Sequence, residues 1–254
     1  MARNELALLR LSNQYLLRTG ERMEVLRAMN GFQAQFLSNA LYAMRLRSTA
    51  YDTAHAADSL VKSWTLRGTM HIFAEADLPL FLHTGCRYRS RDWTVPSFWN
   101  QRPDWALTPQ RQAYFSDLIV DALAQGPMTR EALKDRCRAA GMTQAEEGSI
   151  FHPWGGGIRE LCERGFLCGT VSEEKAFRLC PAFTPMEEQD ALLEQTRRYF
   201  TNYGPASVRD AAYYFGSSQA EIEKRLARLP VEAAKYEGCL LYTSPSPRDG
   251  LLSR

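Results

Sequence analysis

Apolar residues recur at helical spacing along most of this chain and alternate with polar residues only over short stretches. The alternation over residues 64–73, around Gly68, predicts a β-hairpin or a bent strand. A further helix is expected over residues 77–91, and residues 92–107 are expected to form an irregular aromatic connector that packs against a domain face. The helical pattern before the hairpin predicts helices over residues 4–17, 21–29, 33–47 and 55–62.

The order of helices followed by a hairpin returns later in the chain. Gly126-Pro127 and Gly204-Pro205 both precede a hydroxyl residue, an arginine and an acid at a new helix start. These two segments lie 78 residues apart, a spacing that suits a tandem of small domains; the alternative is that two helix caps look alike by chance. The expected helices cover residues 108–125, 129–140, 144–164 with an interruption, 186–202, 206–215 and 218–228; the expected strands cover residues 166–171, 176–180 and 231–236.

Helices followed by a small hairpin are the layout of a winged helix. The sequence therefore predicts a mainly α fold with small β-hairpins (α+β), built from tandem winged-helix domains of which the third is incomplete. Residues 238–254 depart from the pattern and resemble a translated sequencing-adapter remnant, so they are expected to be a non-native or disordered tail. The predicted units are residues 1–107, which hold the connector, residues 108–184 and residues 185–237.

Composition restricts the class of protein. The 254 residues are 45% hydrophobic and 24% charged, which is ordinary for a globular chain. No apolar run is long enough to span a membrane, and no secretory signal begins the chain. The six cysteines form no CxxC pair, so reduced thiols in a cytoplasmic protein without a metal site are expected.

Charge is unevenly distributed, although the net charge is only +2. Residues 1–111 carry 14 Lys and Arg against 9 acids, and 26 of the 31 basic residues of the chain are Arg. Arginine favours forked contacts with phosphate, which hints at a polyanionic partner. A genome rich in G and C, which encodes Arg in place of Lys, is the alternative explanation.

Two glutamines stand out in the segment Asn30-Gly31-Phe32-Gln33-Ala34-Gln35. Each carboxamide offers an acceptor and two donors without a charge. Positions i and i+2 of a helix point about 200° apart. Gln33 and Gln35 can therefore reach one substrate only if this segment is extended or lies in a first helical turn; otherwise one or neither is functional.

Several segments together resemble the AlkZ/YcaQ-type winged-helix proteins, a group of bacterial DNA glycosylases. The resemblance covers residues 1–237, and its specific part is the Gln-apolar-Gln motif at Gln33 and Gln35. It implies a site that releases bulky N7-alkylated purines, including some interstrand crosslinks, and it implies that the family's C-terminal β-rich part is missing here. The segments are Leu9 to Gln14, Gly31 to Gln35, Arg67 to His71, Asp77 to Pro79 and the helix start after Gly204-Pro205.

Hydrolysis of such a lesion needs little acid catalysis, because alkylation at N7 already makes the purine a good leaving group. A carboxamide oxygen of Gln33 or Gln35 can accept a hydrogen bond from the attacking water and face the developing charge of the sugar. An undamaged base would require a carboxylate. The candidate DNA-binding residues are Arg45, Arg47, Arg67, His71, Arg87, Arg89 and Arg91.

Two hypotheses follow from the sequence. The first is a monomeric, monofunctional DNA glycosylase that acts on double-stranded DNA without cofactor, metal or membrane. The second is a non-catalytic winged-helix DNA-binding or regulatory protein. Gln33 and Gln35 exposed at the centre of a basic concave surface would favour the first hypothesis, whereas buried glutamines would favour the second.

Overall fold

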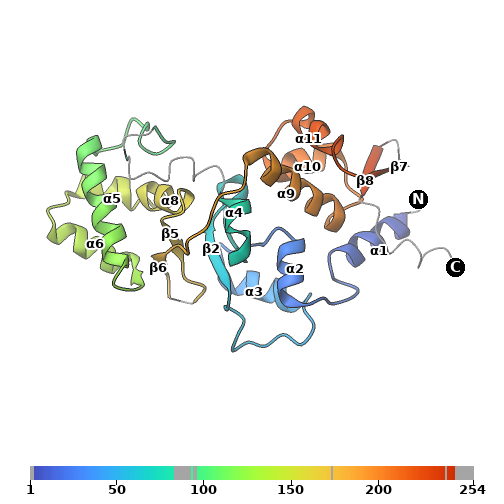
Figure 1. The fold of residues 1–254 in the computed structure, drawn as a ribbon, viewed down its shortest axis with the longest axis horizontal. Helices are drawn as coiled ribbons and strands as arrows, with labels where there is room; N and C mark the ends of the chain where they lie inside the picture. The colour runs from blue at the N-terminus through green and yellow to red at the C-terminus, as the bar shows by residue number, and fades with distance from the viewer. Residues whose placement is uncertain (1–2, 83–92, 94–95, 173, 238, 244–254) are drawn as a thin grey trace.

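The computed structural model describes residues 3–82, 93, 96–172, 174–237 and 239–243. Helices and strands gather into three groups, and Figure 1 shows them along an elongated molecule. The group with α5, α6 and α8 lies at the left of the view. The group with α2 and α3 lies low near the middle, and α9 to α11 lie at the upper right. This arrangement confirms the predicted α+β class.

The first group departs from the predicted helices in three places. The helix expected over residues 4–17 ends at Asn13. The helix expected over residues 33–47 begins only at Leu37, because Phe32 and Gln33 form an edge strand. The helix expected over residues 55–62 is wrong, since residues 60–64 are a strand. The elements are α1 (Arg3–Asn13), α2 (Arg22–Ala28), β1 (Phe32–Gln33), α3 (Leu37–Arg45), β2 (Leu60–Trp64) and β3 (Met70–Ala74).

Burial on both faces explains why β2 looked helical. Leu60 packs in the cluster beneath α2 and α3, and its neighbour Val61 packs in the cluster on the opposite face of the sheet. A strand buried on both faces reads as a continuous apolar run, without the alternation that marks a half-exposed strand. Of the helix expected over 77–91, the structure describes α4 (Leu78–Phe81), and residues 83–92 lie outside the described ranges.

The hairpins of the first two groups join in one sheet with the strand order β1-β3-β2-β5-β6-β4. The predicted hairpin around Gly68 is confirmed as β2 and β3, which pair antiparallel from Leu60 opposite Ala74 to Trp64 opposite Met70. The junction is the pairing of Lys62 with Gly169 of β5. The two hairpins that the sequence predicted as separate are therefore parts of one continuous sheet.

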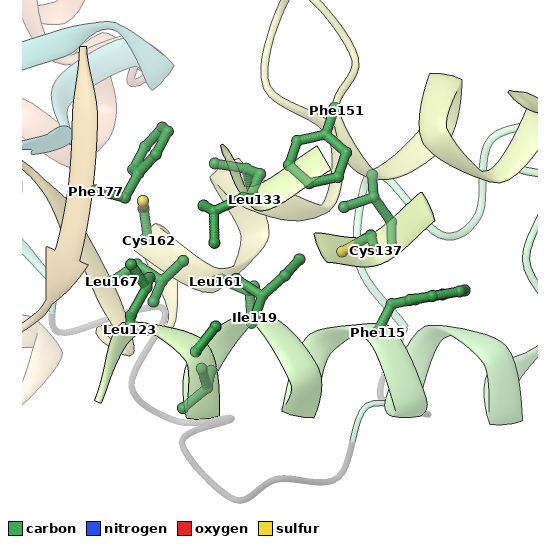
Figure 2. Close-up of a cluster of buried hydrophobic side chains, with 14 of the residues drawn as sticks. Phe115, Ile119, Leu123, Leu133, Cys137, Phe151, Leu161, Cys162, Leu167 and Phe177 are labelled. Atoms are coloured by element: carbon green, nitrogen blue, oxygen red, sulfur yellow. The ribbon is translucent and has the colours of Figure 1, made fainter. Parts of the chain in front are cut away.

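The second group matches the prediction most closely. Thr129 caps its helix as expected, because its side chain accepts a hydrogen bond from the backbone N–H of Ala132. Trp93 and Trp99 of the connector are buried, as predicted for an aromatic stretch that packs against a domain. Figure 2 shows the core, with Phe115, Ile119 and Leu123 of α5 below Leu133 and Cys137 of α6. The elements are α5 (Pro109–Leu123), β4 (Met128–Thr129), α6 (Arg130–Ala139), α7 (Gln144–Ile150), α8 (Gly156–Glu163), β5 (Leu167–Gly169) and β6 (Ala176–Leu179).

The third group contains a hairpin that the sequence did not predict. Residues 239–243 were assigned to the tail, yet they pair with β7 over five residue positions. Tyr242 also exchanges two backbone hydrogen bonds with Ala206, and Leu241 is buried. The ordered part of this unit therefore extends beyond residue 237. The elements are α9 (Glu188–Asn202), α10 (Val208–Phe215), α11 (Gln219–Leu226), β7 (Glu232–Tyr236) and β8 (Cys239–Thr243).

Side chains of α9 hold the carboxyl end of α2. Arg198, Asn202 and Tyr203 donate hydrogen bonds to the carbonyls of Arg27, Ala28 and Met29, at 3.0, 2.9 and 3.1 Å. These carbonyls lie in the last turn of α2 and at its C-cap, where the regular intrahelical donors run out; the Arg27 carbonyl also accepts from the backbone N–H of Asn30. One helix of the third group thus satisfies the helix end that leads into the Gln-apolar-Gln segment.

A buried ion pair supports the same junction. Both guanidinium nitrogens Nη1 and Nη2 of Arg198 donate to the carboxylate of Asp77, at 2.7 and 2.9 Å. The side chains of Arg198 and Asp77 are only 8% and 3% exposed. The forked geometry offsets the cost of removing both charges from water.

Arg198→Ala should lower the free energy of unfolding by about 3 kcal/mol, because the substitution leaves the buried Asp77 with only the longer, 3.3 Å contact to Nε of Arg27. Urea unfolding followed by circular dichroism measures this loss. The control is Asp135→Ala, since Asp135 pairs with Arg138 on the surface, and it should change stability by no more than about 1 kcal/mol. Equal effects of the two substitutions would contradict the role of the buried pair.

Candidate functional site

The Gln-apolar-Gln segment is extended in the structure. Phe32 lies opposite Ile72 and Gln33 lies opposite His71 across the β1–β3 ladder. The backbone N–H of Ala34 continues the ladder with a 2.7 Å hydrogen bond to the carbonyl of Met70. Successive side chains of an extended chain point to opposite faces, so residues two apart share a face.

Burial follows this alternation. Phe32 and Ala34 are buried, and Gln33 and Gln35 are exposed. Gln33 therefore projects from the edge strand toward solvent, and Gln35 is exposed in the bend that follows it. That both glutamines act on one substrate stays a prediction.

Two residues with positive φ turn the chain from α2 into this strand. Asn30 has φ 54° and Gly31 has φ 77°. A Cβ on Gly31 would lie 2.5 Å from the carbonyl oxygen of Ile72, so the backbones approach too closely for a side chain. Asn30 is buried, and its Nδ2 donates to the carbonyl of Gln195 on α9 at 3.0 Å. The position of the glutamines therefore depends on α9 as well as on β3.

His71 lies next to Gln33 in the sheet, and Ser63 of β2 lies on its other side. Its Nδ1 is 3.0 Å from the carbonyl oxygen of Thr69, which can only accept, so Nδ1 carries the hydrogen. The side chain is buried, and burial lowers its pKa. The DNA contact predicted for His71 stays a prediction, and the side chain that would make it is buried in the structure.

Arg67 occupies the turn between β2 and β3 and is exposed. Its guanidinium carbon lies 5.9 Å from the ring centre of Tyr213 and 5.6 Å from that of Tyr214. The positive charge of Arg67 also contributes to the lowered pKa of His71. The hairpin turn thus brings a cation between the Gln-bearing sheet and α10.

The other predicted arginines differ in environment. Arg45, in the last turn of α3, is exposed. Arg47 is half-buried, with its guanidinium 5.5 Å from the ring centre of Phe32 and its Nη1 donating to the carbonyl of Ala43 at 2.9 Å. Burial lowers the pKa of Arg47. Arg87, Arg89 and Arg91 lie outside the described residues.

Sequence reasoning missed the tyrosines that border the site. Tyr203 and Tyr214 lie within 5.3 Å of each other by ring centre, and Tyr199 lies 4.7 Å from Tyr214. They stand more than 160 residues after Gln33 along the chain, so no local pattern connects them with the motif. A cavity of about 490 Å³ opens beside this region, between residues that include Trp64, Arg67, Phe98 and Phe215.

In the ranges that the structure covers, no helix has the length and apolarity needed to cross a bilayer. Among the same residues, no three His, Cys, Asp or Glu side chains gather as a metal site would require.

Comparisons with known proteins agree on one family. The family model described as "DNA glycosylase AlkZ-like" matches residues 26–251. An interstrand DNA cross-link repair glycosylase of Streptomyces sahachiroi is 29% identical over 202 residues, which cover 73% of this chain and 52% of that protein. The chain therefore spans about half the length of this relative. The solved structure of Streptomyces sahachiroi DNA glycosylase AlkZ shares the fold, with a TM-score of 0.74 over 100% of this chain and 72% of that one, at 21% identity.

Gly31→Ala should destabilise the protein by about 2–3 kcal/mol, because it combines an unfavourable φ with a clash against β3. The control is Gly141→Ala, at φ 82° but with no atom near its added Cβ, which should cost only about 1–2 kcal/mol. Thermal unfolding of both variants measures the difference. A Gly31→Ala variant as stable as Gly141→Ala would contradict the close approach of β1 and β3.

His71 should make stability depend on pH. The folded protein lowers the pKa of this imidazole, so the unfolded chain binds more protons below the ordinary value of about 6.5. Stability from this source is fully present above that pH and is lost as the pH falls below it. The loss between pH 7.5 and pH 5 in urea unfolding should be smaller for His71→Gln than for the parent protein.

His55→Gln is the control for this measurement. His55 is exposed, and its hydrogen bond to Asp52 raises its pKa, so its linkage has the opposite sign. A His71→Gln variant that loses as much stability on acidification as the parent would show that His71 does not titrate in this range.

Proposed function

The chain belongs to the AlkZ-like DNA glycosylase family, and from this premise we propose that it hydrolyses the N-glycosidic bond of N7-alkylated purines in double-stranded DNA. The proposal includes the unhooking of crosslinks that join two such purines, in line with the name of the cross-link repair relative. The observation that carries it is the exposure of both Gln33, on the edge strand β1, and Gln35, in the bend directly after it.

The proposed reaction breaks the bond between C1′ of the sugar and N9 of the purine. The electron pair of that bond moves to the base and neutralises the positive charge that alkylation placed at N7. A cationic sugar remains, water adds to C1′, and the water loses one proton to solvent. Because the leaving group departs without protonation, the protein has to hold the water and stabilise the cation.

Neutral amides suit these two tasks. The carbonyl oxygen of Gln33 or Gln35 accepts a hydrogen bond from the attacking water, and the dipole of the second amide faces the sugar cation. A carboxylate would be the stronger base, but this substrate is already activated. In this proposal the amides hold the attacking water, and no side chain with a shifted pKa has to remove its proton.

The charges around the glutamines suit a substrate in which a positively charged purine is part of negatively charged DNA. Burial lowers the pKa of His71, which lies opposite Gln33 in the ladder, and so favours its uncharged form near a positively charged purine. Arg67 and Arg45 are exposed on neighbouring elements, where they are placed for phosphate contacts. Arg47 instead packs on Phe32 and supports the strand that carries the motif.

The three groups of helices and their hairpins serve in this proposal as three winged-helix units. The first carries the glutamines, the second is fixed to it through the sheet, and the third supplies the tyrosines and the donors on α9. The tandem would present one extended surface to a duplex.

Gln33→Ala and Gln35→Ala should each slow single-turnover release of N7-methylguanine from duplex DNA by about 100-fold, because each removes one group that acts on the transition state. The affinity for an abasic-site duplex should stay within about three-fold of the parent value. The control is Gln144→Ala, an exposed carboxamide at the start of α7, which should leave both quantities unchanged. DNA binding without base release by the parent chain would favour a non-catalytic DNA-binding protein.

A further inference from the structure

Tyr213 is the most exposed large hydrophobic side chain among those described, with 81% of its surface accessible. It lies on α10, which otherwise buries its apolar positions in the third group, for example Ala211. A shallow groove runs past this ring toward the start of α11. Its lining includes Arg67, Arg209, Tyr213, Ser217 and Ser218.

Two cations flank the exposed ring. Arg67 reaches it from the β2–β3 turn, with the guanidinium carbon 5.9 Å from the ring centre. Arg209 is exposed and precedes Tyr213 by four positions, so it lies on the same face of α10. The groove therefore combines an exposed aromatic ring with cations from two different units of the fold.

The neighbouring acids are already engaged. Asp210 accepts hydrogen bonds from the hydroxyl and backbone N–H of Ser207 in the capping box of α10. Glu221 accepts from Ser217 and Ser218 at the start of α11. Arg67 and Arg209 form no salt bridge in the described part of the structure, so their charge is available to an anion.

The support beneath the ring is rigid. Tyr214, the next residue, packs against Tyr199 and Tyr203, and burial raises its pKa well above the ordinary value. Arg67 also lies 5.6 Å from the ring centre of Tyr214. The turn of α10 that presents Tyr213 is thereby fixed to the same hairpin that pairs with the Gln-bearing strand.

We propose that Tyr213 stacks against an unstacked nucleobase of the bound DNA while Arg67 and Arg209 hold the adjoining phosphates. The inference rests on the proposed function for its ligand, and charge complementarity favours a nucleic-acid strand as the occupant. Stacking on an aromatic side chain tolerates any base, so this subsite positions the strand and does not read its sequence. Arg67 lies in the turn between β2 and β3, so the subsite borders the hairpin that pairs with the Gln33 strand.

The test is binding of the 254-residue chain to a duplex that contains an abasic-site analogue next to 2-aminopurine. Tyr213→Ala should weaken binding about ten-fold, the scale expected for one lost base–aromatic stack. Tyr213→Phe keeps the ring and should stay within two-fold of the parent. Tyr114→Ala, which removes another exposed tyrosine from α5, should have no effect. Stacking should quench 2-aminopurine fluorescence with the parent and Tyr213→Phe, but not with Tyr213→Ala.

Arg209→Gln separates the electrostatic part of the subsite. The slope of log Kd against log salt should become shallower by about 0.9, the value of one phosphate contact. Tyr213→Ala should leave that slope unchanged. Circular dichroism on each variant establishes that it is folded.

Parent-like binding by Tyr213→Ala would overturn the proposal, and so would an equal loss in Tyr213→Ala and Tyr213→Phe. If Arg209→Gln gave a shallower salt slope while Tyr213→Ala still quenched 2-aminopurine, the groove would bind phosphate alone. That result would also overturn the proposed stack. The assay does not depend on base release. A parent chain that binds as expected but releases no base would refute the proposed hydrolysis while leaving the subsite in place.

Discussion

Arg198 and Asn202 of α9, and Tyr203 directly after it, donate side-chain hydrogen bonds to three consecutive carbonyls at the end of α2. A helix that ends inside a protein needs donors for its last carbonyls, and here side chains from about 170 residues further along the chain supply them in addition to the local backbone. These contacts help to hold the end of α2 and the turn at Asn30 and Gly31. The edge strand and its two amides take their position from that turn. The buried pair between Asp77 and Arg198 secures the donor side of the same arrangement.

The sequence predicted correctly those helices and strands whose conformation is set by neighbouring residues along the chain. The helices of the second and third groups carry their own caps and spacing, so Thr129 and Ser207 marked their starts correctly. The sequence did not predict β2. Leu60 and Val61 are buried in different clusters, so this strand lacks the alternation of apolar and polar residues that marks a half-exposed strand. The extended conformation at Gln33 depends on hydrogen bonds with β3, a strand almost forty residues away. Likewise, the pairing of residues 239–243 with β7 overrode a composition typical of a disordered tail.

For the site, the motif identified the glutamines but could not predict their surroundings. His71 reads in sequence like a surface residue at the end of a wing, yet the strand register places it in the interior of the sheet. The tyrosines of α9 and α10 reach the region only through tertiary contacts. The resulting electrostatic pattern is consistent: neutral groups stand next to the proposed reaction centre, and cations stand where phosphates would pass. A site of this kind selects substrates that bring their own activation.

The pairing of Lys62 with Gly169 has a mechanical consequence. It joins the two hairpins in one sheet, so the units that carry them are held by strand pairing as well as by the chain between them. A duplex that binds across this joint would bend to follow it, and sites where damage has already weakened base stacking bend at the least cost. The joined sheet would then help to distinguish damaged from intact DNA before any amide reaches a sugar.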